Sequence, residues 1–248
     1  MSKPKPDYGL DAPAVCRNLF GGGLAALGVG VFVALWGERN HSGAVSGVGS
    51  FIFNAGIGCV IGAALMFTSS RFGKLRARDR ILDRLNLSGD ETVFDLGCGH
   101  GLLLIGAAKR LPHGRAVGID LWSQVDQGNN SRDATLRNAA LEGVAERVEV
   151  RDGDMRKLPF PDAAFDAAVA HFAIHNIPSR EGRREAIREI VRVLKPGGQV
   201  ALSDMKSVGL YADELRKSGM SEVKISWPSL WTWPPARTVT ARKPDAAK

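Results

Sequence analysis

The chain has 248 residues, enough for one large domain or for a domain with an appendage, so its length excludes little. Its three cysteines, Cys16, Cys59 and Cys98, are far apart, and no C-x-x-C pair or Cys/His cluster accompanies them. This spacing argues against a disulfide framework and against a structural zinc site. The formal net charge of +7 permits an anionic partner, either a nucleic acid or an anionic membrane surface.

The first 70 residues contain two long stretches without a charged side chain. Residues 18–37 form the first, whose length matches the roughly 20 residues that a helix needs to cross a bilayer core. The second extends to Ser70, with its apolar part at residues 45–67, and polar residues 38–42 separate the two. We therefore predict that residues 1–70 form a membrane anchor of two transmembrane helices. The alternatives are two buried helices of a soluble protein, or a signal peptide in the first stretch.

Small residues and basic residues add detail to this predicted hairpin. Small residues recur every four positions: Gly22, Ala26, Gly30 and Ala34 in the first stretch, Gly58 and Gly62 in the second. This spacing lets helix backbones approach closely in lipid. Basic residues lie mainly outside the stretches: Lys3, Lys5 and Arg17 before them, Arg39 in the turn, and Arg71, Lys74, Arg76, Arg78, Arg80 and Arg84 after them. The positive-inside rule then places both ends, and the domain that follows, in the cytoplasm.

From Arg71 onward, short apolar runs alternate with amphipathic segments. The predicted strands are residues 92–95, 115–119, 147–151, 165–170 and 199–203, with two closing strands at 222–226 and 237–241. The predicted helices are residues 102–111, 131–142, 180–194 and 212–217. Alternating strands and helices favour an α/β domain, residues 71–248, whose sheet is largely parallel and has helices on both faces.

A glycine-rich turn follows the first of these strands. Gly97, Gly99 and Gly101 stand between a strand and a helix, where glycine lets the backbone pass close to a ligand and the helix presents free N–H groups. Dinucleotide-binding folds have a related G-x-G-x-x-G loop, so this motif alone does not identify the ligand.

Three further features follow the glycine-rich turn in order. Asp120 ends the second strand about 20 residues later, where a carboxylate can accept both hydroxyls of a ribose. Asp154 and Met155 follow the third strand, and an acid there can accept an adenine amino group. Residues 194–198, Leu-Lys-Pro-Gly-Gly, precede the fifth strand. For each acid the alternative is an ordinary turn or surface residue.

With these four features, residues 77–242 resemble the class I S-adenosylmethionine-dependent methyltransferases, particularly the ubiquinone/menaquinone and small-molecule branch. The resemblance implies a Rossmann-like doubly wound sheet of about seven strands, the last antiparallel, with S-adenosyl-L-methionine across the carboxyl ends of the first strands. It also implies these cofactor contacts: Asp95, Gly97, Gly99 and Gly101 at the methionine part, Asp120 at the ribose, and Leu121, Asp154 and Met155 at the adenine. No metal site is expected.

Two histidines follow the fourth strand, in a segment that faces the transferring methyl group in the family. His171 or His175 can serve as a general base for a hydroxyl or an acidic carbon, because imidazole titrates near working pH. Alternatively, both are ordinary hydrogen-bonded residues, and methyl transfer proceeds by alignment alone. The segment lacks the Asn/Asp-Pro-Pro-aromatic motif of amino-methylating nucleic-acid enzymes, which argues against a base amine as acceptor.

A loop of unusual composition lies between the two closing strands. Residues 227–235 contain three tryptophans and three prolines. The segment is interpreted as an aromatic plate over the substrate pocket, as an anchor in the lipid headgroup zone, or simply as a well-packed loop.

The leading hypothesis is a membrane-anchored methyltransferase that acts on a small, lipophilic or membrane-derived acceptor. One alternative is an RNA or DNA methyltransferase, although no recognisable nucleic-acid module accompanies the core. Another is a non-catalytic membrane protein that binds S-adenosylmethionine. The acceptor atom and the oligomeric state do not follow from the sequence.

Overall fold

The computed structural model describes residues 4–123 and 129–246, so Lys3 lies outside the described residues. The chain forms two compact units. One, the hairpin unit, is Leu10–Phe72. The other, the sheet unit, combines the residues up to Gly9 with those from Gly73 onward.

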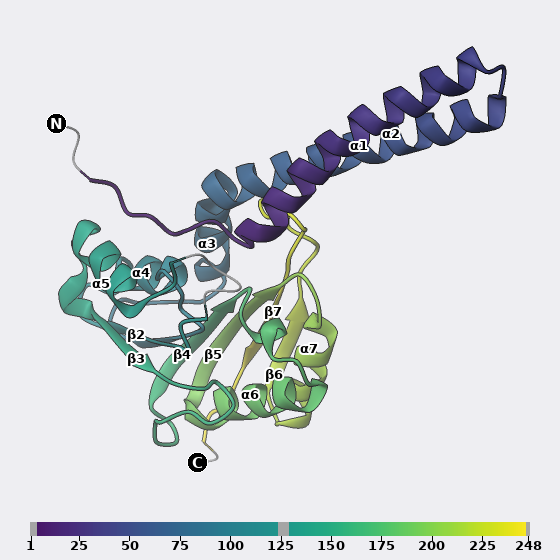
Figure 1. Cartoon of the computed structure of the whole chain (residues 1–248). Coiled ribbons are helices and arrows are strands. Elements are labelled where there is room, and N and C mark those ends of the chain that lie inside the picture. Colours follow the sequence, from purple (N-terminus) through teal and green to yellow (C-terminus); the bar gives the residue numbers. More distant parts are fainter. Residues whose placement is uncertain (1–3, 124–128, 247–248) are drawn as a thin grey trace. The chain divides into compact units, whose positions relative to one another are not determined.

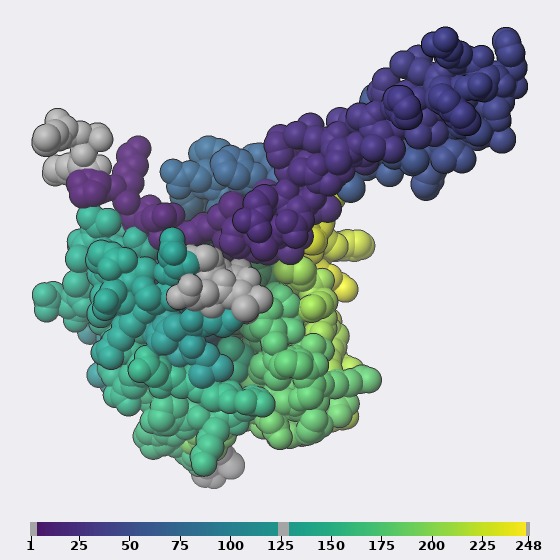
Figure 2. Space-filling model, viewed as in Figure 1, coloured from purple at the N-terminus to yellow at the C-terminus, as the bar shows by residue number. Residues whose placement is uncertain are grey.

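The hairpin unit consists of α1 (Pro13–Arg39) and α2 (Gly43–Thr68), which lie side by side and antiparallel (Figures 1 and 2). Both are long and apolar enough to cross a membrane, and only 11% of the most apolar window of each is buried. Their large apolar side chains point outward; Phe32 is 69% exposed and Phe51 is 75% exposed. The hairpin therefore has no apolar core of its own, and its outer surface is apolar.

The two helices touch through small residues at a spacing of seven. The buried residues are Gly23, Gly30 and Gly37 in α1, and Gly49, Gly56 and Ala63 in α2. A Cβ on Gly30 would lie 2.5 Å from the Phe53 backbone nitrogen, so the two backbones are in contact.

The predicted spacing of four holds only in part. Gly30 and Ala34 lie at the contact between the helices, whereas the space around Gly22, Gly58 and Gly62 is open, with no described atom within 4 Å of an added Cβ. Steps of four drift about 40° around a helix, whereas steps of seven drift only about 20°, so only the latter stay on one contact line along a long pair.

The sheet unit contains a seven-stranded sheet in the order β3-β2-β1-β4-β5-β7-β6 (Figure 1). Its strands are β1 (Thr92–Leu96), β2 (Arg115–Asp120), β3 (Val148–Asp152), β4 (Phe165–His171), β5 (Leu194–Asp204), β6 (Ser221–Ile225) and β7 (Arg237–Arg242). The first five are parallel, and β7 runs antiparallel to both of its neighbours. This confirms the predicted fold class.

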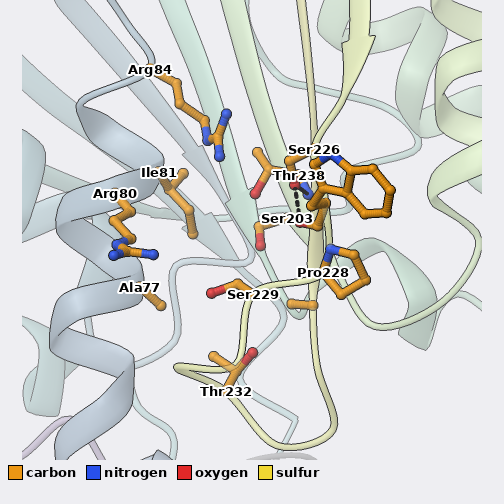
Figure 3. Close-up of a pocket in the computed structure, with 12 residues that line it drawn as sticks. Ala77, Arg80, Ile81, Arg84, Ser203, Ser226, Pro228, Ser229, Thr232 and Thr238 are labelled. Atoms are coloured by element: carbon orange, nitrogen blue, oxygen red, sulfur yellow. Dashed lines mark hydrogen bonds between the residues drawn. The ribbon is translucent and has the colours of Figure 1, made fainter.

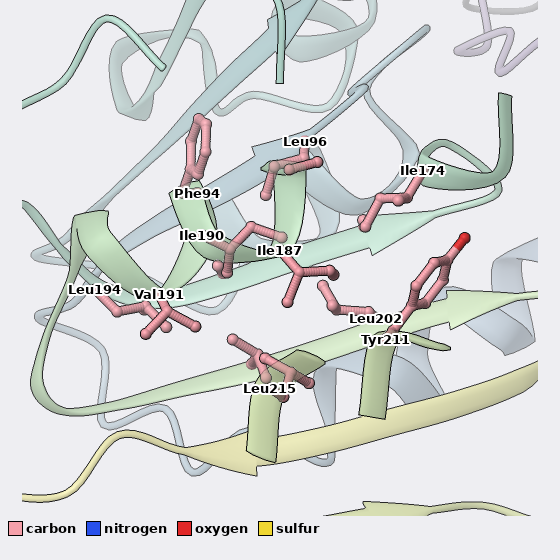
Figure 4. Packing of buried hydrophobic residues seen from close by; sticks show 14 of the residues in the cluster. Phe94, Leu96, Ile174, Ile187, Ile190, Val191, Leu194, Leu202, Tyr211 and Leu215 are labelled. Atoms are coloured by element: carbon pink, nitrogen blue, oxygen red, sulfur yellow. The ribbon is translucent and has the colours of Figure 1, made fainter. Parts of the chain in front are cut away.

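Helices cover both faces of the sheet. They are α3 (Lys74–Leu82), α4 (Leu102–Ala108), α5 (Arg132–Leu141), α6 (Arg180–Val193) and α7 (Val208–Lys217), with short turns η1 (Ser69–Gly73), η2 (Ala145–Arg147) and η3 (Ile174–Asn176). On one face α6 and α7 pack against strand residues such as Phe94 and Leu202 (Figure 4). On the other face α3, α4 and α5 pack against Val93, Val169 and Ala201.

Residues 4–9 belong to the sheet unit, although the sequence had grouped them with the anchor. Tyr8 is buried among the residues of α3 and α4. The Asp7 amide donates to Asn138 Oδ1 on α5 at 2.9 Å, and Lys74 Nζ donates to the Tyr8 carbonyl at 2.8 Å. Gly9 therefore lies close to Lys74, where the sheet unit resumes.

Candidate cofactor and acceptor site

The glycine loop after β1 requires glycine at each predicted position. Gly97, Gly99 and Gly101 have φ angles of +68°, +50° and +85°, in the left-handed region that side chains disfavour. A Cβ on Gly97 would lie 2.5 Å from the Ala173 Cβ, so the loop also touches the segment after β4. The Gly97 amide donates to the Ile119 carbonyl at 2.9 Å. The loop is thus fixed beside the ends of β2 and β4.

Asp120, at the end of β2, holds the glycine loop from the side. Its Oδ2 accepts the Gly99 amide at 2.8 Å, and its Oδ1 accepts the Trp122 amide at 2.6 Å and Asn130 Nδ2 at 3.2 Å. Each carboxylate oxygen has about two acceptor positions, so Oδ2 retains capacity for a further donor. Asp120 is therefore both a structural part of the loop and a fitting acceptor for a ribose hydroxyl.

Asp95 lies behind the loop rather than on an exposed surface. It is 2% exposed, and its Oδ2 accepts the Leu104 amide in the first turn of α4 at 2.8 Å. Burial, reinforced by the charge of Asp120, raises the pKa of Asp95 to about 8 despite that hydrogen bond. In the structure its visible role is to hold α4 against the glycine loop.

The three predicted adenine contacts differ in their surroundings. Leu121 is 65% exposed at the edge of the sheet. The Asp154 carboxylate forms an ion pair with Arg156 at 2.6 Å, and hydrogen bonds from Arg156 lower the pKa of Asp154. Met155 is half-buried, and its Cε lies 3.4 Å from the position of a Cβ on Gly97. Met155 is thus the one of the three that the structure brings to the glycine loop.

The two candidate histidines differ in position and in partners. His171 is the last residue of β4, and its ring stacks on Phe172 with centroids 4.1 Å apart. His175 lies in η3, and its Nδ1 is 2.7 Å from Asp204 Oδ1. His171 therefore ends β4 rather than following it, and His175 comes four residues later; both lie at the carboxyl edge of the sheet.

Asp204 was not among the residues predicted from the sequence. It ends β5 and is 2% exposed. Tyr211 donates its hydroxyl to Asp204 Oδ2 at 3.0 Å, and the Met205 amide donates to Oδ1 at 2.8 Å. Asp204 is thus held in place by these two hydrogen bonds, with its carboxylate next to the His175 ring. The signal in the sequence was an acid at the end of the fifth strand, on the same edge as the glycine loop.

A row of polar residues crosses three strands at this edge. His171 on β4 is in register with Ser203 on β5, which is in register with Thr238 on β7. Side chains alternate between faces along a strand, and Val169 and Ala201 belong to the α3 and α4 face. His171, Ser203 and Thr238 therefore share that face.

A cavity of about 320 Å³ adjoins this row (Figure 3). It is lined by Ala77, Arg80, Ile81, Arg84, Ser203, Ser226, Trp227, Pro228, Ser229, Thr232, Ala236 and Thr238. The loop of residues 226–236 closes one side of it, and α3 with the following turn closes the other. The sequence had singled out the tryptophan- and proline-rich loop but not the cavity.

Trp231 connects that loop to α3. The guanidinium carbon of Arg76 lies 4.4 Å from the Trp231 ring centroid, and that of Arg80 lies 5.4 Å from it. These are cation–π distances, so the tryptophan fixes the loop over the cavity. Trp227 and Pro228 line the cavity themselves.

The sheet order, the antiparallel β7 and the glycine loop define the fold of Rossmann-like methyltransferases. Residues 94–202 match the family model described as "Methyltransferase domain". This segment is therefore similar to a methyltransferase domain, and its glycine cradle and Asp120 fit S-adenosylmethionine as a cofactor.

Two curated relatives show the range of this similarity. Demethylmenaquinone methyltransferase of Lactobacillus johnsonii is 29% identical over 128 residues, which cover 50% of this chain and 48% of that protein. The 27-O-demethylrifamycin SV methyltransferase of Amycolatopsis mediterranei is 33% identical over 157 residues, which cover 60% of this chain and 54% of that protein. The chain spans about half the length of the curated relatives it matches.

Solved structures share the fold at lower identity. A SAM-dependent methyltransferase from Aquifex aeolicus superposes with a TM-score of 0.54 at 20% identity, covering 68% of this chain and 90% of that one. The [4+2]-cyclase SpnF superposes with a TM-score of 0.58 at 23% identity, covering 69% of this chain and 81% of that one. Since one neighbour is a cyclase, the fold alone does not fix the reaction.

Proposed function

We propose that this protein transfers a methyl group from S-adenosylmethionine to a small, lipophilic acceptor that a membrane presents. The proposal rests on one observation: the glycine loop and the cavity both lie next to the end of β4. Gly97 contacts the segment after β4, and Ser203 of the cavity is in register with His171 on β4. A cofactor at the loop and an acceptor in the cavity would thus meet at the end of β4.

In this proposal the glycine loop holds the methionine part of the cofactor, with Asp95 supporting the loop from behind. Asp120 accepts the ribose hydroxyls, while Leu121, Asp154 and Met155 surround the adenine. When bound, the cofactor supplies a methyl group on a positively charged sulfur. The protein's task is then to align the acceptor atom with that methyl group and, for a hydroxyl or acidic carbon, to remove a proton.

The proton acceptor is proposed to be one of the two histidines. His175 is a candidate because its Nδ1 lies 2.7 Å from Oδ1 of the buried Asp204. His171 lies on the face of the sheet that carries the cavity. Each would take a proton from the acceptor and release it to solvent after methyl transfer.

The two relatives are named for small-molecule substrates, demethylmenaquinone and 27-O-demethylrifamycin SV. This favours a small-molecule acceptor. Nucleic acid is disfavoured because the segment after β4 lacks the motif of base-amine methylation. The test is incubation of the full-length protein with labelled-methyl S-adenosylmethionine and fractionated membrane lipids, soluble metabolites or RNA. Label in the lipid fraction supports the proposal, and label in RNA alone contradicts it.

We further propose that the hairpin unit spans the membrane twice, with the sheet unit in the cytoplasm. The outward apolar side chains and the scarcity of buried positions support this, since core helices of a soluble protein are mostly buried. The excess of basic residues outside the spans supports the orientation. Full-length protein should then resist extraction by alkaline carbonate, and a tag at residues 38–42 should be accessible only from the non-cytoplasmic side.

A matched variant separates anchoring from catalysis. Because Lys74 bonds the carbonyls of Tyr8 and Gly9, residues 10–72 can be replaced by a linker of about six glycine and serine residues, which spans up to about 20 Å. This variant keeps the N-terminal contacts that a simple truncation would remove. We expect it to bind the cofactor normally and to methylate a lipophilic acceptor poorly at low concentration. Equal efficiency would show that the hairpin does not present the acceptor.

A further inference from the structure

The cavity beside the polar row has a cationic, hydroxyl-rich wall. Arg80 and Arg84 line it from the α3 side, and no Asp or Glu is among its lining residues. Among the described residues, neither guanidinium forms an ion pair with an acid of the chain. Figure 3 shows Arg84 reaching from that side toward Ser203 and Ser226. Two cations without a counter-charge make this wall suited to an anion.

Two hydroxyls on the opposite wall have no hydrogen-bond partner among the described residues. Thr232 is 2% exposed, and its Oγ1 is buried without a hydrogen-bond partner in the described part of the chain. The Ser229 Oγ atom is likewise buried without such a partner. Ser229 points across the cavity toward α3 (Figure 3). A buried hydroxyl that leaves water without gaining a hydrogen bond is costly, so such groups are uncommon without a reason. A ligand in the cavity would supply the missing acceptor.

Part of the remaining lining is apolar. Ala77, Ile81, Pro228 and Ala236 line the cavity beside the hydroxyls of Ser203, Ser226 and Thr238. The volume of about 320 Å³ lies at the lower end of the range for small-molecule sites and exceeds what one oxyanion fills. The cavity thus fits a molecule with an anionic group and an adjoining apolar part.

We propose that this cavity binds the phosphate group of an amphiphilic acceptor. Two guanidinium groups and two hydroxyls on facing walls suit a phosphate, because its tetrahedral oxygens accept hydrogen bonds from several sides, whereas the acceptor positions of a carboxylate lie in one plane. Adjacent strands lie about 4.8 Å apart, so Ser203 and Thr238 are about 5 and 10 Å from the backbone of His171. The methylated atom would then be a few bonds from the phosphate. This last step rests on the proposed function, whereas phosphate binding does not.

The test is titration calorimetry of the full-length protein in a neutral, phosphate-free detergent. The probes are inorganic phosphate, dihexanoyl phosphatidic acid and dihexanoylglycerol. We expect both phosphate compounds to bind and the uncharged diacylglycerol not to bind. Tighter binding of phosphatidic acid identifies a lipid headgroup as the source, and equal binding identifies a soluble phosphate compound. Absence of binding by both phosphate compounds would overturn the proposal.

Variants place the binding in the cavity. Arg84→Gln should weaken phosphatidic acid binding tenfold or more, the scale of one hydrogen bond to a charged group. In the described part of the chain Trp231 is contacted by Arg76 and Arg80 and not by Arg84, so this change leaves the loop contact of Arg80 in place. Arg137→Gln, on the exposed surface of α5, removes the same charge elsewhere and should change affinity less than twofold. Equal losses of phosphatidic acid affinity in the two variants would show that the effect comes from net charge alone, and would refute the site.

Binding of S-adenosylhomocysteine, measured on the same samples, keeps the two proposals apart. Arg84→Gln should leave it unchanged, because Arg84 lies outside the glycine loop. Phosphate binding without S-adenosylhomocysteine binding would refute the proposed function and leave the anion site standing. The reverse result would refute the anion site alone.

Discussion

Replacing Asp120 by asparagine tests the proposed cofactor site most directly. The carboxylate accepts the Gly99 amide at 2.8 Å and the Trp122 amide at 2.6 Å, and we propose that it also accepts ribose hydroxyls. Asparagine keeps the shape but offers one acceptor oxygen and one donor group, so one amide loses its partner. A hydrogen bond to a charged group contributes about 1.5–3 kcal/mol, which corresponds to a loss of roughly 10- to 150-fold in affinity.

The assay is titration calorimetry with S-adenosylhomocysteine and with its 2′-deoxy analogue. A direct bond to the ribose predicts that the variant loses affinity for the parent compound but little for the analogue. A double-mutant cycle that combines Asp120→Asn with removal of the 2′-hydroxyl should then give a coupling energy of about 1 kcal/mol or more. Asp213→Asn, an exposed acid of α7 paired with Arg216, is the matched control and should change nothing.

Two outcomes would refute this reasoning in different ways. Affinity within threefold of the parent would remove Asp120 from the cofactor site altogether. Equal losses for S-adenosylhomocysteine and for the 2′-deoxy analogue would show that Asp120 acts only by holding the glycine loop at Gly99.

Three further outcomes follow from the geometry. Gly97→Ala should abolish measurable cofactor binding, because an L-residue at φ +68° is strained and its Cβ would lie 2.5 Å from Ala173; retained affinity in calorimetry would contradict the close approach. Asp95 has a folded-state pKa of about 8, above its unfolded value, so it stabilises the fold at low pH and loses that contribution as pH rises. From pH 5 to 7, the free energy of unfolding of the parent, measured with urea, should therefore fall by up to about 1.4 kcal/mol per pH unit relative to that of Asp95→Asn. Parallel pH dependences of the two free energies would disprove the raised pKa. Thr232→Val should stabilise the ligand-free protein by about 1 kcal/mol while weakening phosphate binding, and destabilisation would show that the hydroxyl is satisfied.

The fold was predictable because its signals are local. Each parallel strand is a short buried run, and the glycines that follow β1 mark the turn into α4. The antiparallel β7 came from the resemblance and not from periodicity. The segment at residues 194–198 was expected to precede the fifth strand, yet β5 begins at Leu194, which pairs with Phe165 of β4.

The site was predictable only where its residues follow a strand directly. Asp120 and His171 end their strands, so the topology brings them to one edge. The cavity, by contrast, joins α3 to the loop at residues 226–236, and no local pattern in either segment shows that they meet. The seven-residue spacing in the hairpin could not be recognised from the sequence either. Glycine is so frequent there that small residues also recur every four positions, and the sequence does not show which spacing forms the contact.

The last prediction concerns which histidine removes the proton, because the two lie on opposite faces of the sheet. His171 shares the face of the cavity with Ser203 and Thr238. Asp204 points to the other face, where it contacts Tyr211 of α7, and it brings His175 to that side. Both faces meet at the carboxyl edge, so an acceptor held in the cavity reaches His171 first and must extend over the edge to reach His175.

If the phosphate anchor in the cavity is correct, His171→Ala should lower kcat by about 100-fold while His175→Ala lowers it only a few-fold. If instead His175 is the base, Asp204→Asn should lower kcat together with His175→Ala, since Asp204 lies beside the His175 ring. S-adenosylhomocysteine affinity should stay unchanged in all three variants. A few-fold loss in every variant would leave alignment of the acceptor as the source of catalysis, because transfer from a sulfonium to a nucleophile that is already deprotonated needs no base.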